Sequence, residues 1–267
     1  MSPTLRSAAG SDIGRRRLMN QDSAATSPRL LALADGMGGH AHGEVASTVA
    51  VTAFLDLASR LEGVDLGEVD LLASLSEAIE DASARINALA DAEPEMRGTG
   101  TTVVAFLVDG ARIGVLHIGD SRAYLLRDGE LLRMTRDHTL VQALVDEGRI
   151  SAEEAADHPR RSWLIRTLQD GAVAEPDLFL HDGRIGDRYL ICSDGVTAVL
   201  DDAEIHEVLA GRAQRAEAVT GLIERANAGG GPDNITCIVA DLVEELAPEE
   251  EAPLIVGAAA ERSDGSS

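Results

Sequence analysis

Several aspartates share one sequence setting: each lies at the border between an apolar run and a glycine or another small residue. They occur in LALADGMGG (Asp35), VLHIGDSR (Asp120), YLICSDGV (Asp194) and GGGPDNITCIV (Asp233), and Asp22 in MNQDS is a fifth acid of this kind. For any one of them alone, an ordinary turn is the favoured explanation. Together they suggest more, because the strand ends of a sandwich converge on one edge. Five carboxylates at such an edge would repel one another unless cations lay between them.

Carboxylates gathered in this way predict a site for hard divalent cations. Oxygen ligands suit Mg²⁺ or Mn²⁺, and neighbouring glycines let a metal ion and a substrate approach the backbone closely. A basic group is also near: Arg17, in GRRRLMNQDS, shortly precedes Asp22. A carboxylate-rich site with an arginine and no cysteine ligands is what two-metal hydrolysis of a phosphoester requires.

Apolar periodicity predicts the elements that would position these acids. Strands are expected at residues 4–13, 29–34, 187–193 and 234–243, with a meander of short strands over 101–134. Amphipathic helices are expected at residues 44–61, 68–90, 201–210 and 214–227. Two groups of strands, each followed by a helix pair, predict an α+β fold: two packed antiparallel β-sheets flanked by helix pairs.

Two segments depart from this pattern. Residues 139–175 are polar, contain short helical pieces and are broken by Pro159, and they predict a small flap subdomain. Residues 244–267 shift to Glu, Ala, Pro and Ser, which predicts a disordered acidic and Ala-rich tail after one domain covering residues 1–243.

Composition excludes several classes of partner. The chain has 267 residues and a formal net charge of −23, which disfavours nucleic acid and anionic membrane surfaces. Apolar residues make up 45%, enough for a sizeable core. The sequence shows no apolar run long enough to span a bilayer and no N-terminal signal pattern, so a cytoplasmic protein is expected. Nothing in it indicates an obligate interface, and a monomer is expected.

Eight sequence blocks, in order, carry a family resemblance. They are SDIGRRRLMNQDS, LALADGMGGHAHGEVAS, GTGTTVV, IGDSRAYLLRDGEL, TRDHTLVQALVDEGRI, HPRRSWLIRTL, LICSDGV and GGPDNITCIV. This set resembles the bacterial metal-dependent (PPM, 2C-type) protein serine/threonine phosphatases from about residue 6 to residue 243. The resemblance implies the same sandwich of sheets and helix pairs that the periodicity predicts.

The resemblance also implies a metal-ligand set. Asp35 matches the acid that bridges two Mn²⁺ or Mg²⁺ ions, and the Gly36 carbonyl matches a ligand of one of them. Asp194 and Asp233 match the acids that complete one ion's shell. Asp22 matches an acid that acts behind the metals or through water.

A third, weaker metal site is implied beside the first two. Asp120, together with Asp194, matches its position in many bacterial members, and Ser162 in the flap is a candidate further ligand. Arg17 matches the phosphate-binding arginine, whose planar guanidinium can grip two phosphoryl oxygens.

The implied reaction is direct hydrolysis of phosphoserine or phosphothreonine by a water that two metals activate, opposing a bacterial serine/threonine kinase. His40 is the best candidate for the acid that protonates the leaving oxygen, and an exposed loop histidine without that role is an equal alternative. Gln21 stands where many members have Glu, so Gln21→Glu is predicted to tighten Mn²⁺ binding. The alternative function is a catalytically weak member that acts as a phosphoprotein-binding or regulatory module.

Overall fold

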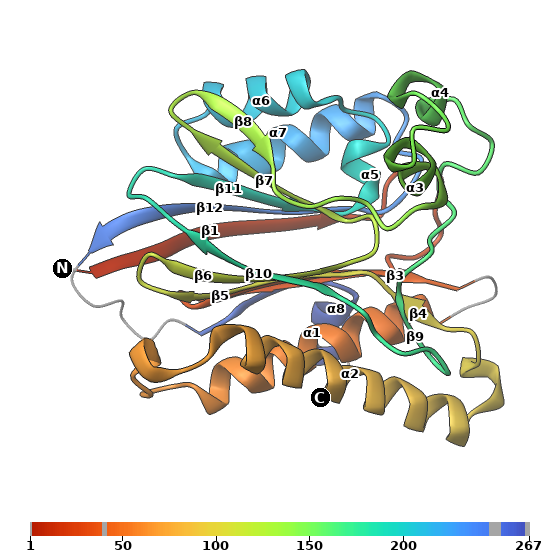
Figure 1. Cartoon of the computed structure of the whole chain (residues 1–267), viewed down its shortest axis with the longest axis horizontal. Coiled ribbons are helices and arrows are strands. Elements are labelled where there is room, and N and C mark those ends of the chain that lie inside the picture. Colours follow the sequence, from red (N-terminus) through yellow and green to blue (C-terminus); the bar gives the residue numbers. More distant parts are fainter. Residues whose placement is uncertain (1, 39–41, 246–251, 265–267) are drawn as a thin grey trace.

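The computed structural model describes residues 2–38, 42–245 and 252–264, and two antiparallel sheets packed face to face form its centre. Helices cover both outer faces of this pair of sheets (Figure 1). The predicted α+β fold with two sheets flanked by helices is therefore confirmed.

The first sheet contains the first and the last strand of the expected catalytic domain, residues 1–243. Its strand order is β1-β12-β11-β7-β8. The bounds are β1 (Ser2–Asp12), β7 (Arg122–Arg127), β8 (Glu130–Arg133), β11 (Arg188–Cys192) and β12 (Ile235–Glu245). Antiparallel pairing puts the end of β11 and the starts of β7 and β12 at one edge, because Cys192 lies opposite both Arg122 and Cys237.

The second sheet has the strand order β10-β6-β5-β3-β2-β13, and two short strands extend it beside β3. The bounds are β2 (Asp22–Thr26), β3 (Leu30–Met37), β4 (Gly100–Thr101), β5 (Val103–Asp109), β6 (Arg112–Ile118), β9 (Leu168–Gln169), β10 (Asp177–Asp182) and β13 (Leu254–Gly257). The start of β2, the end of β3 and the end of β6 lie at the same end of the sandwich as the edge described above (Figure 1).

Helices close the two outer faces. On the second sheet these are α1 (Gly43–Arg60), α2 (Leu71–Ala92) and α8 (Ala258–Asp264). The short 3₁₀ helix η1 (Leu66–Glu68) lies between α1 and α2, and a second one, η2 (Pro94–Met96), follows α2. On the first sheet they are α5 (Asp194–Thr197), α6 (Asp202–Gly211) and α7 (Arg215–Ala228). Side chains fix where helices begin: Asp70 accepts hydrogen bonds from the first turn of α2, and Asp201 with Glu204 forms a capping box at α6.

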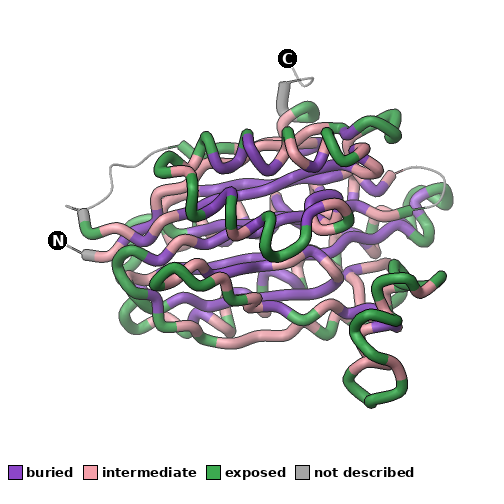
Figure 2. The backbone as a smooth tube through the Cα atoms, turned by 90° about the horizontal axis from the view of Figure 1, so that it is seen from above, coloured by how far each residue is buried: buried purple, intermediate pink, exposed green. Residues whose placement is uncertain are grey.

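The core has three apolar layers, one between the sheets and one under each set of helices. Figure 2 shows buried residues following the strands through the middle of the molecule, with exposed residues at turns and outer helix faces. Because aromatics are scarce, mostly Ala, Val, Leu and Ile fill these layers, and each gains by leaving water. Among the described residues, no helix is both long and apolar enough to cross a membrane.

The flap leaves the sheets after β8. It contains α3 (Leu140–Asp146) and α4 (Ala152–Ala156), and its base is closed by a bridge between Thr139 and Leu164. Trp163 in this segment is 55% exposed, and the Arg160 guanidinium lies over its ring.

The structure corrects the predicted tail. Residues 254–264 are not disordered: β13 pairs with β2, and α8 packs on α1. The local reason is close contact, since a Cβ on Gly257 would lie 2.2 Å from the Asp22 carbonyl oxygen. Arg262 also lies 3.7 Å from Glu44 at the start of α1. The predicted disorder of residues 246–251 and 265–267 falls outside the described residues.

Candidate metal centre

Five aspartates from both sheets converge on one end of the sandwich, as the sequence predicts. Asp22 begins β2 and lies directly opposite Asp35 on β3. Asp194 begins α5 just after β11, and Asp233 lies two residues before the start of β12. Asp120 occupies the turn between β6 and β7.

The electrostatics show how close together these carboxyl groups lie. Burial raises the pKa of Asp35 well above its ordinary value, and the charges of the other four aspartates raise it further. Burial likewise raises the pKa of Asp194, followed by the charges of Asp120, Asp233 and Asp22. Burial also raises the pKa values of Asp22 and Asp120, each to about 6. The crowded oxygen donors therefore fit a hard divalent cation, which would relieve both burial and repulsion.

Asp22 is the most deeply buried of the five and joins the two sheets. The residue is 1% exposed, and its Oδ2 accepts a hydrogen bond of 2.8 Å from the hydroxyl of Ser193, which directly follows β11 of the first sheet. The Ser193 oxygen in turn accepts from the backbone N–H of Thr236 on β12 at 3.0 Å. Asp22 is thus fixed from behind by residues that the sequence did not single out.

Arg17 is the basic group at this edge. Its Nη2 donates to Asp233 Oδ2 at 2.6 Å, and its side chain is 49% exposed. The hydrogen bond to Asp233 raises the pKa of Arg17, and the charges of Asp194 and Asp35 act in the same direction. The guanidinium therefore faces the carboxylate cluster while remaining open to solvent.

A glycine and an asparagine bring the Arg17 loop to this position. Gly14 has φ +80°, and a Cβ there would lie 2.1 Å from the Asp233 carbonyl oxygen, so only glycine allows the approach. Asn234, 4% exposed, accepts from the Gln21 N–H at 2.9 Å. Its amide nitrogen donates to the carbonyls of Ile13 and Met19, both at 3.0 Å. Sequence reasoning missed Asn234, although it stands beside Asp233 in the quoted GGPDN block.

Gly36 and Gln21 lie where the end of β3 meets the start of α1. A Cβ on Gly36 would lie 2.1 Å from the carbonyl oxygen of Gly43, so the helix start packs directly on the strand. The Gln21 side-chain amide donates to Glu44 Oε2 at 3.2 Å. His40 lies outside the described residues, so its role as an acid stays a prediction.

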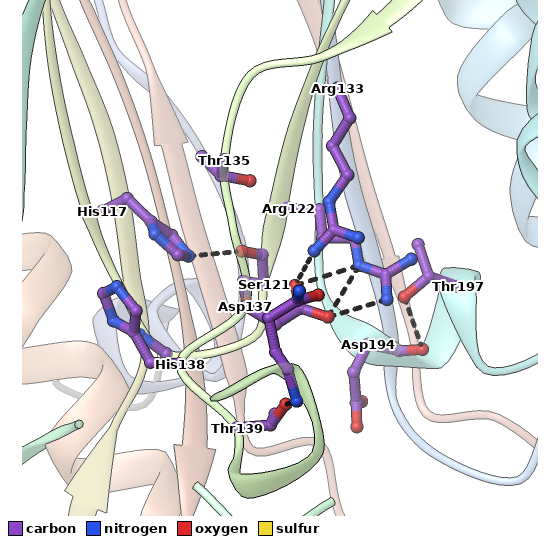
Figure 3. A network of polar contacts seen from close by, with 12 residues as sticks. His117, Ser121, Arg122, Arg133, Thr135, Asp137, His138, Thr139, Asp194 and Thr197 are labelled. Atoms are coloured by element: carbon purple, nitrogen blue, oxygen red, sulfur yellow. Dashed lines mark hydrogen bonds and ion pairs between the residues drawn. The ribbon is translucent and has the colours of Figure 1, made fainter. Parts of the chain in front are cut away.

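A cavity of about 480 Å³ lies between this edge and the flap. Its walls include Asp120, Asp194 and the exposed Ser162, so the three predicted third-site residues border one space. Asp137 also lines the cavity, where it accepts from Arg122 at 2.8 Å and pairs with Arg133 (Figure 3). Asp137 is thus already paired with two arginines.

The chain is similar to known proteins in both sequence and fold. The model of the family described as "Protein phosphatase 2C" matches residues 9–227. The serine/threonine protein phosphatase PstP of Mycobacterium tuberculosis is 49% identical over 254 residues, which cover 95% of this chain and 48% of that protein. The chain thus spans about half the length of this curated relative. The serine/threonine phosphatase stp of Listeria innocua is 34% identical over 86% of this chain and 93% of that protein.

One similar solved structure contains metal ions. It is the catalytic domain of PstP in complex with two manganese ions, which superposes with a TM-score of 0.83 at 48% identity. The match covers 91% of this chain and 100% of that one.

Proposed function

This chain belongs to the 2C-type (PPM) metal-dependent protein phosphatase family in its bacterial form, and from that premise we propose that it hydrolyses phosphoserine and phosphothreonine in proteins. The observation that carries the proposal is the convergence of five aspartates beside Arg17 at one edge of the sandwich. The names of the relatives support the same reaction.

The proposed cofactor is Mn²⁺ or Mg²⁺, with two or three ions in each chain. Asp35 would bridge two ions, the Gly36 carbonyl would bind one of them, and Asp194 and Asp233 would complete a shell. Asp22 would act from behind through water, and Asp120 with Asp194, with Ser162 as a candidate, would hold a third ion. When bound, such ions lower the pKa of a shared water and neutralise phosphoryl oxygens. The manganese ions in the PstP structure support this assignment.

The proposed role of Arg17 is to bind the phosphoryl group. Its guanidinium pairs with Asp233 and its side chain is 49% exposed, so we expect it to bind an incoming phosphate while it keeps that ion pair. The loop that carries Arg17 is fixed at both ends by Asn234, so the guanidinium is held near the carboxylates before substrate arrives. His40 is proposed as the donor of a proton to the departing Ser or Thr oxygen.

The wider setting is also a proposal. The substrates would be phosphorylated proteins, including a serine/threonine kinase or its targets, in a bacterial signal-transduction pathway. The cytoplasmic location and the monomeric state are predictions from the sequence. The net charge of −23 supports the absence of nucleic acid and anionic membranes among the partners.

The direct test is hydrolysis of a phosphothreonine peptide with and without Mn²⁺. We expect turnover to stop on chelation and to return when Mn²⁺ is restored. Asp35→Asn should lower the rate by at least about 100-fold, because the bridging carboxylate holds both ions. The matched control is Asp128→Asn in the exposed β7–β8 turn, where φ is +54° and Asn is equally suited, so its activity should equal that of the wild type.

Two outcomes would contradict the proposal. Hydrolysis that survives chelation, or that Asp35→Asn leaves intact, would exclude the two-metal reaction. Binding of several phosphopeptides without turnover of any would favour the alternative of a phosphoprotein-binding module.

A further inference from the structure

The turn that carries Asp120 is held on both sides by buried histidines. On one side, the backbone N–H of Gly119 donates to the ring Nδ1 of His138 at 3.1 Å, and the backbone N–H of His138 donates to the Gly119 carbonyl at 2.8 Å. On the other side, His117 Nε2 donates to the Ser121 carbonyl at 3.1 Å. The two rings lie 4.6 Å apart beside this turn (Figure 3). Asp120 is thus the middle residue of a turn whose neighbours are both clamped.

The same turn is tied to the backbone of Asp35. The Ser121 hydroxyl is 2.7 Å from the Thr102 hydroxyl, and the Thr102 hydroxyl accepts from the Asp35 N–H at 3.1 Å. Gly119 has φ +111°, and a Cβ there would lie 2.5 Å from Thr102. The Asp120 turn and the Asp35 strand end therefore form one hydrogen-bonded unit.

His138 also connects this unit to the far limb of the flap. Its carbonyl accepts from the Ile165 N–H at 2.8 Å, and its Nε2 donates to Asp177 Oδ2 at 3.1 Å. The other Asp177 oxygen accepts from Arg166 Nη1 at 2.8 Å. One residue thus contacts the Asp120 turn, the end of the flap and the start of β10.

The hydrogen bonds fix the protonation of His138. A backbone N–H can only donate, so Nδ1 of His138 must carry a lone pair and Nε2 must carry the proton that Asp177 accepts. Burial lowers the pKa of His138, and it lowers the pKa of His117 to about 4. Both rings are therefore neutral near pH 7.

This protonation state argues against a metal ion held by the histidines themselves. One ligand atom from each of His117, His138 and Asp177 lies within 4.8 Å of the others, a spacing that a metal ion could use. Ligation by His138 Nε2 would move its proton to Nδ1, directly against the Gly119 N–H. The cluster is better suited to holding the turn than to binding a cation.

We propose that His138 is a positioning residue that fixes the Asp120 carboxylate for the third metal ion, and that Asp177 couples this position to the flap. The inference rests on the proposed function, because it assumes that Asp120 binds a cation. It assigns His138 no contact with substrate or metal. It acts through two hydrogen bonds to Gly119, the residue directly before Asp120. One is accepted by the side-chain Nδ1 and is lost in His138→Ala, and the other is donated by the backbone N–H and stays.

The test is a calorimetric titration with Mn²⁺, in which the concentration of free Mn²⁺ is measured from its paramagnetic resonance signal. The wild type should show tight binding events and one weaker event. His138→Ala should weaken the weaker event by about 10-fold or more, the usual effect of removing a residue that orients a metal ligand, and change the tight events less than about twofold. The affinity of the weaker event in His138→Asn should lie between those of the wild type and His138→Ala. The reason is that the Asn Oδ1 can still accept from the Gly119 N–H, while the bond to Asp177 is lost.

A double-mutant cycle separates positioning from general damage to the fold. Asp120→Asn should abolish the weaker event, and adding His138→Ala to it should then change Mn²⁺ binding no further. Asp177→Ala should act in the same direction as His138→Ala and increase hydrogen exchange at the Ile165 amide. His206→Ala on the outer helix α6 is the matched histidine control and should bind Mn²⁺ like the wild type.

Three results would overturn the inference. The first is an unchanged weaker event in both His138 variants. The second is equal weakening of all events, which would indicate a purely structural role. The third is a further loss from His138→Ala in the Asp120→Asn background. A wild type that neither binds Mn²⁺ nor hydrolyses phosphopeptides would instead refute the proposed function, and this inference with it.

Discussion

His117 should make the stability of this protein fall as the pH falls below 6.5. Its ring is fully buried, and burial lowers its pKa from 6.5 to about 4. The unfolded chain therefore takes up a proton on this residue at a pH where the folded chain does not, and the proton stabilises the unfolded state. The contribution is fully present above pH 6.5 and is lost progressively as the pH falls from 6.5 to 4.

The size of the effect follows from the two pKa values. They differ by about 2.5, and each pKa unit corresponds to about 1.4 kcal/mol, so the full loss is about 3 kcal/mol, of which about 2 kcal/mol is reached at pH 5. The surrounding charges are those of His138, which lowers the pKa of His117, and of Asp137 and Asp177, which raise it. Burial is the largest cause, so the direction does not depend on these neighbours.

The measurement compares urea unfolding of the wild type and His117→Gln at several values between pH 8 and pH 5. Gln retains a donor for the Ser121 carbonyl but cannot titrate. Carboxylates titrate equally in both proteins, so the difference between the two free energies of unfolding isolates His117. We expect the stability advantage of the wild type over the variant to shrink by about 2 kcal/mol between pH 8 and pH 5. A difference that does not vary with pH would show that His117 is readily protonated in the folded protein.

Three substitutions test the metal centre. Arg17→Ala should lower kcat/KM by about 10- to 100-fold, which is the contribution of charge-assisted hydrogen bonds to phosphate, and Arg17→Lys should lower it less. Steady-state kinetics measure this effect, and calorimetry should show that the Mn²⁺ affinity of both variants is no weaker than that of the wild type. An unchanged kcat/KM would show that Arg17 does not bind the phosphoryl group. Asn234→Ala leaves three backbone groups without a partner and should lower the free energy of unfolding by about 3 kcal/mol in urea; a loss below about 1 kcal/mol would show that water replaces the amide. Gln21→Glu, which the sequence predicts to tighten Mn²⁺ binding, also places a carboxylate against Glu44. The double variant Gln21→Glu/Glu44→Gln should therefore bind Mn²⁺ more tightly than Gln21→Glu alone when measured by calorimetry. Equal affinities would show that repulsion between residues 21 and 44 has no effect on Mn²⁺ binding.

The sequence predicted the sheets where the apolar pattern was strong and failed where small or mixed residues form strands. Strand β2 has the sequence DSAAT, whose side chains are too small and too polar to show alternation, yet it is buried between β3 and β13. Strand β13 follows a Glu- and Pro-rich stretch, and its order depends on pairing with β2. Neither strand could be predicted locally, because both are stabilised by partners distant in the sequence.

The candidate site divides in the same way. Asp35, Asp120, Asp194 and Asp233 were predictable because each lies near the end of a strand with a strong apolar pattern, and strand ends meet at one edge of a sandwich. The residues that hold them were not, because their contacts span long stretches of the chain. His138 bonds to Gly119 and Asp177, and Asn234 bonds to Gln21. A histidine or asparagine alone carries no sequence signal for such a bond.

The charge balance of the site links cation binding to the stability of the fold. Of the nearby arginines, Arg17 is half exposed and already paired with Asp233, and Arg122 is held by Asp137. Among the residues that the structure describes, Asp22, Asp35 and Asp194 therefore lie in a buried space without an equivalent number of positive charges, and the rest of the fold must offset that unfavourable energy. A cation that binds only the folded chain offsets part of that energy, because it stabilises the folded state by about 2.7 kcal/mol at a concentration 100 times its Kd. The geometry that prepares this edge for metal ions thus also makes the metal-free protein less stable than its core alone would allow.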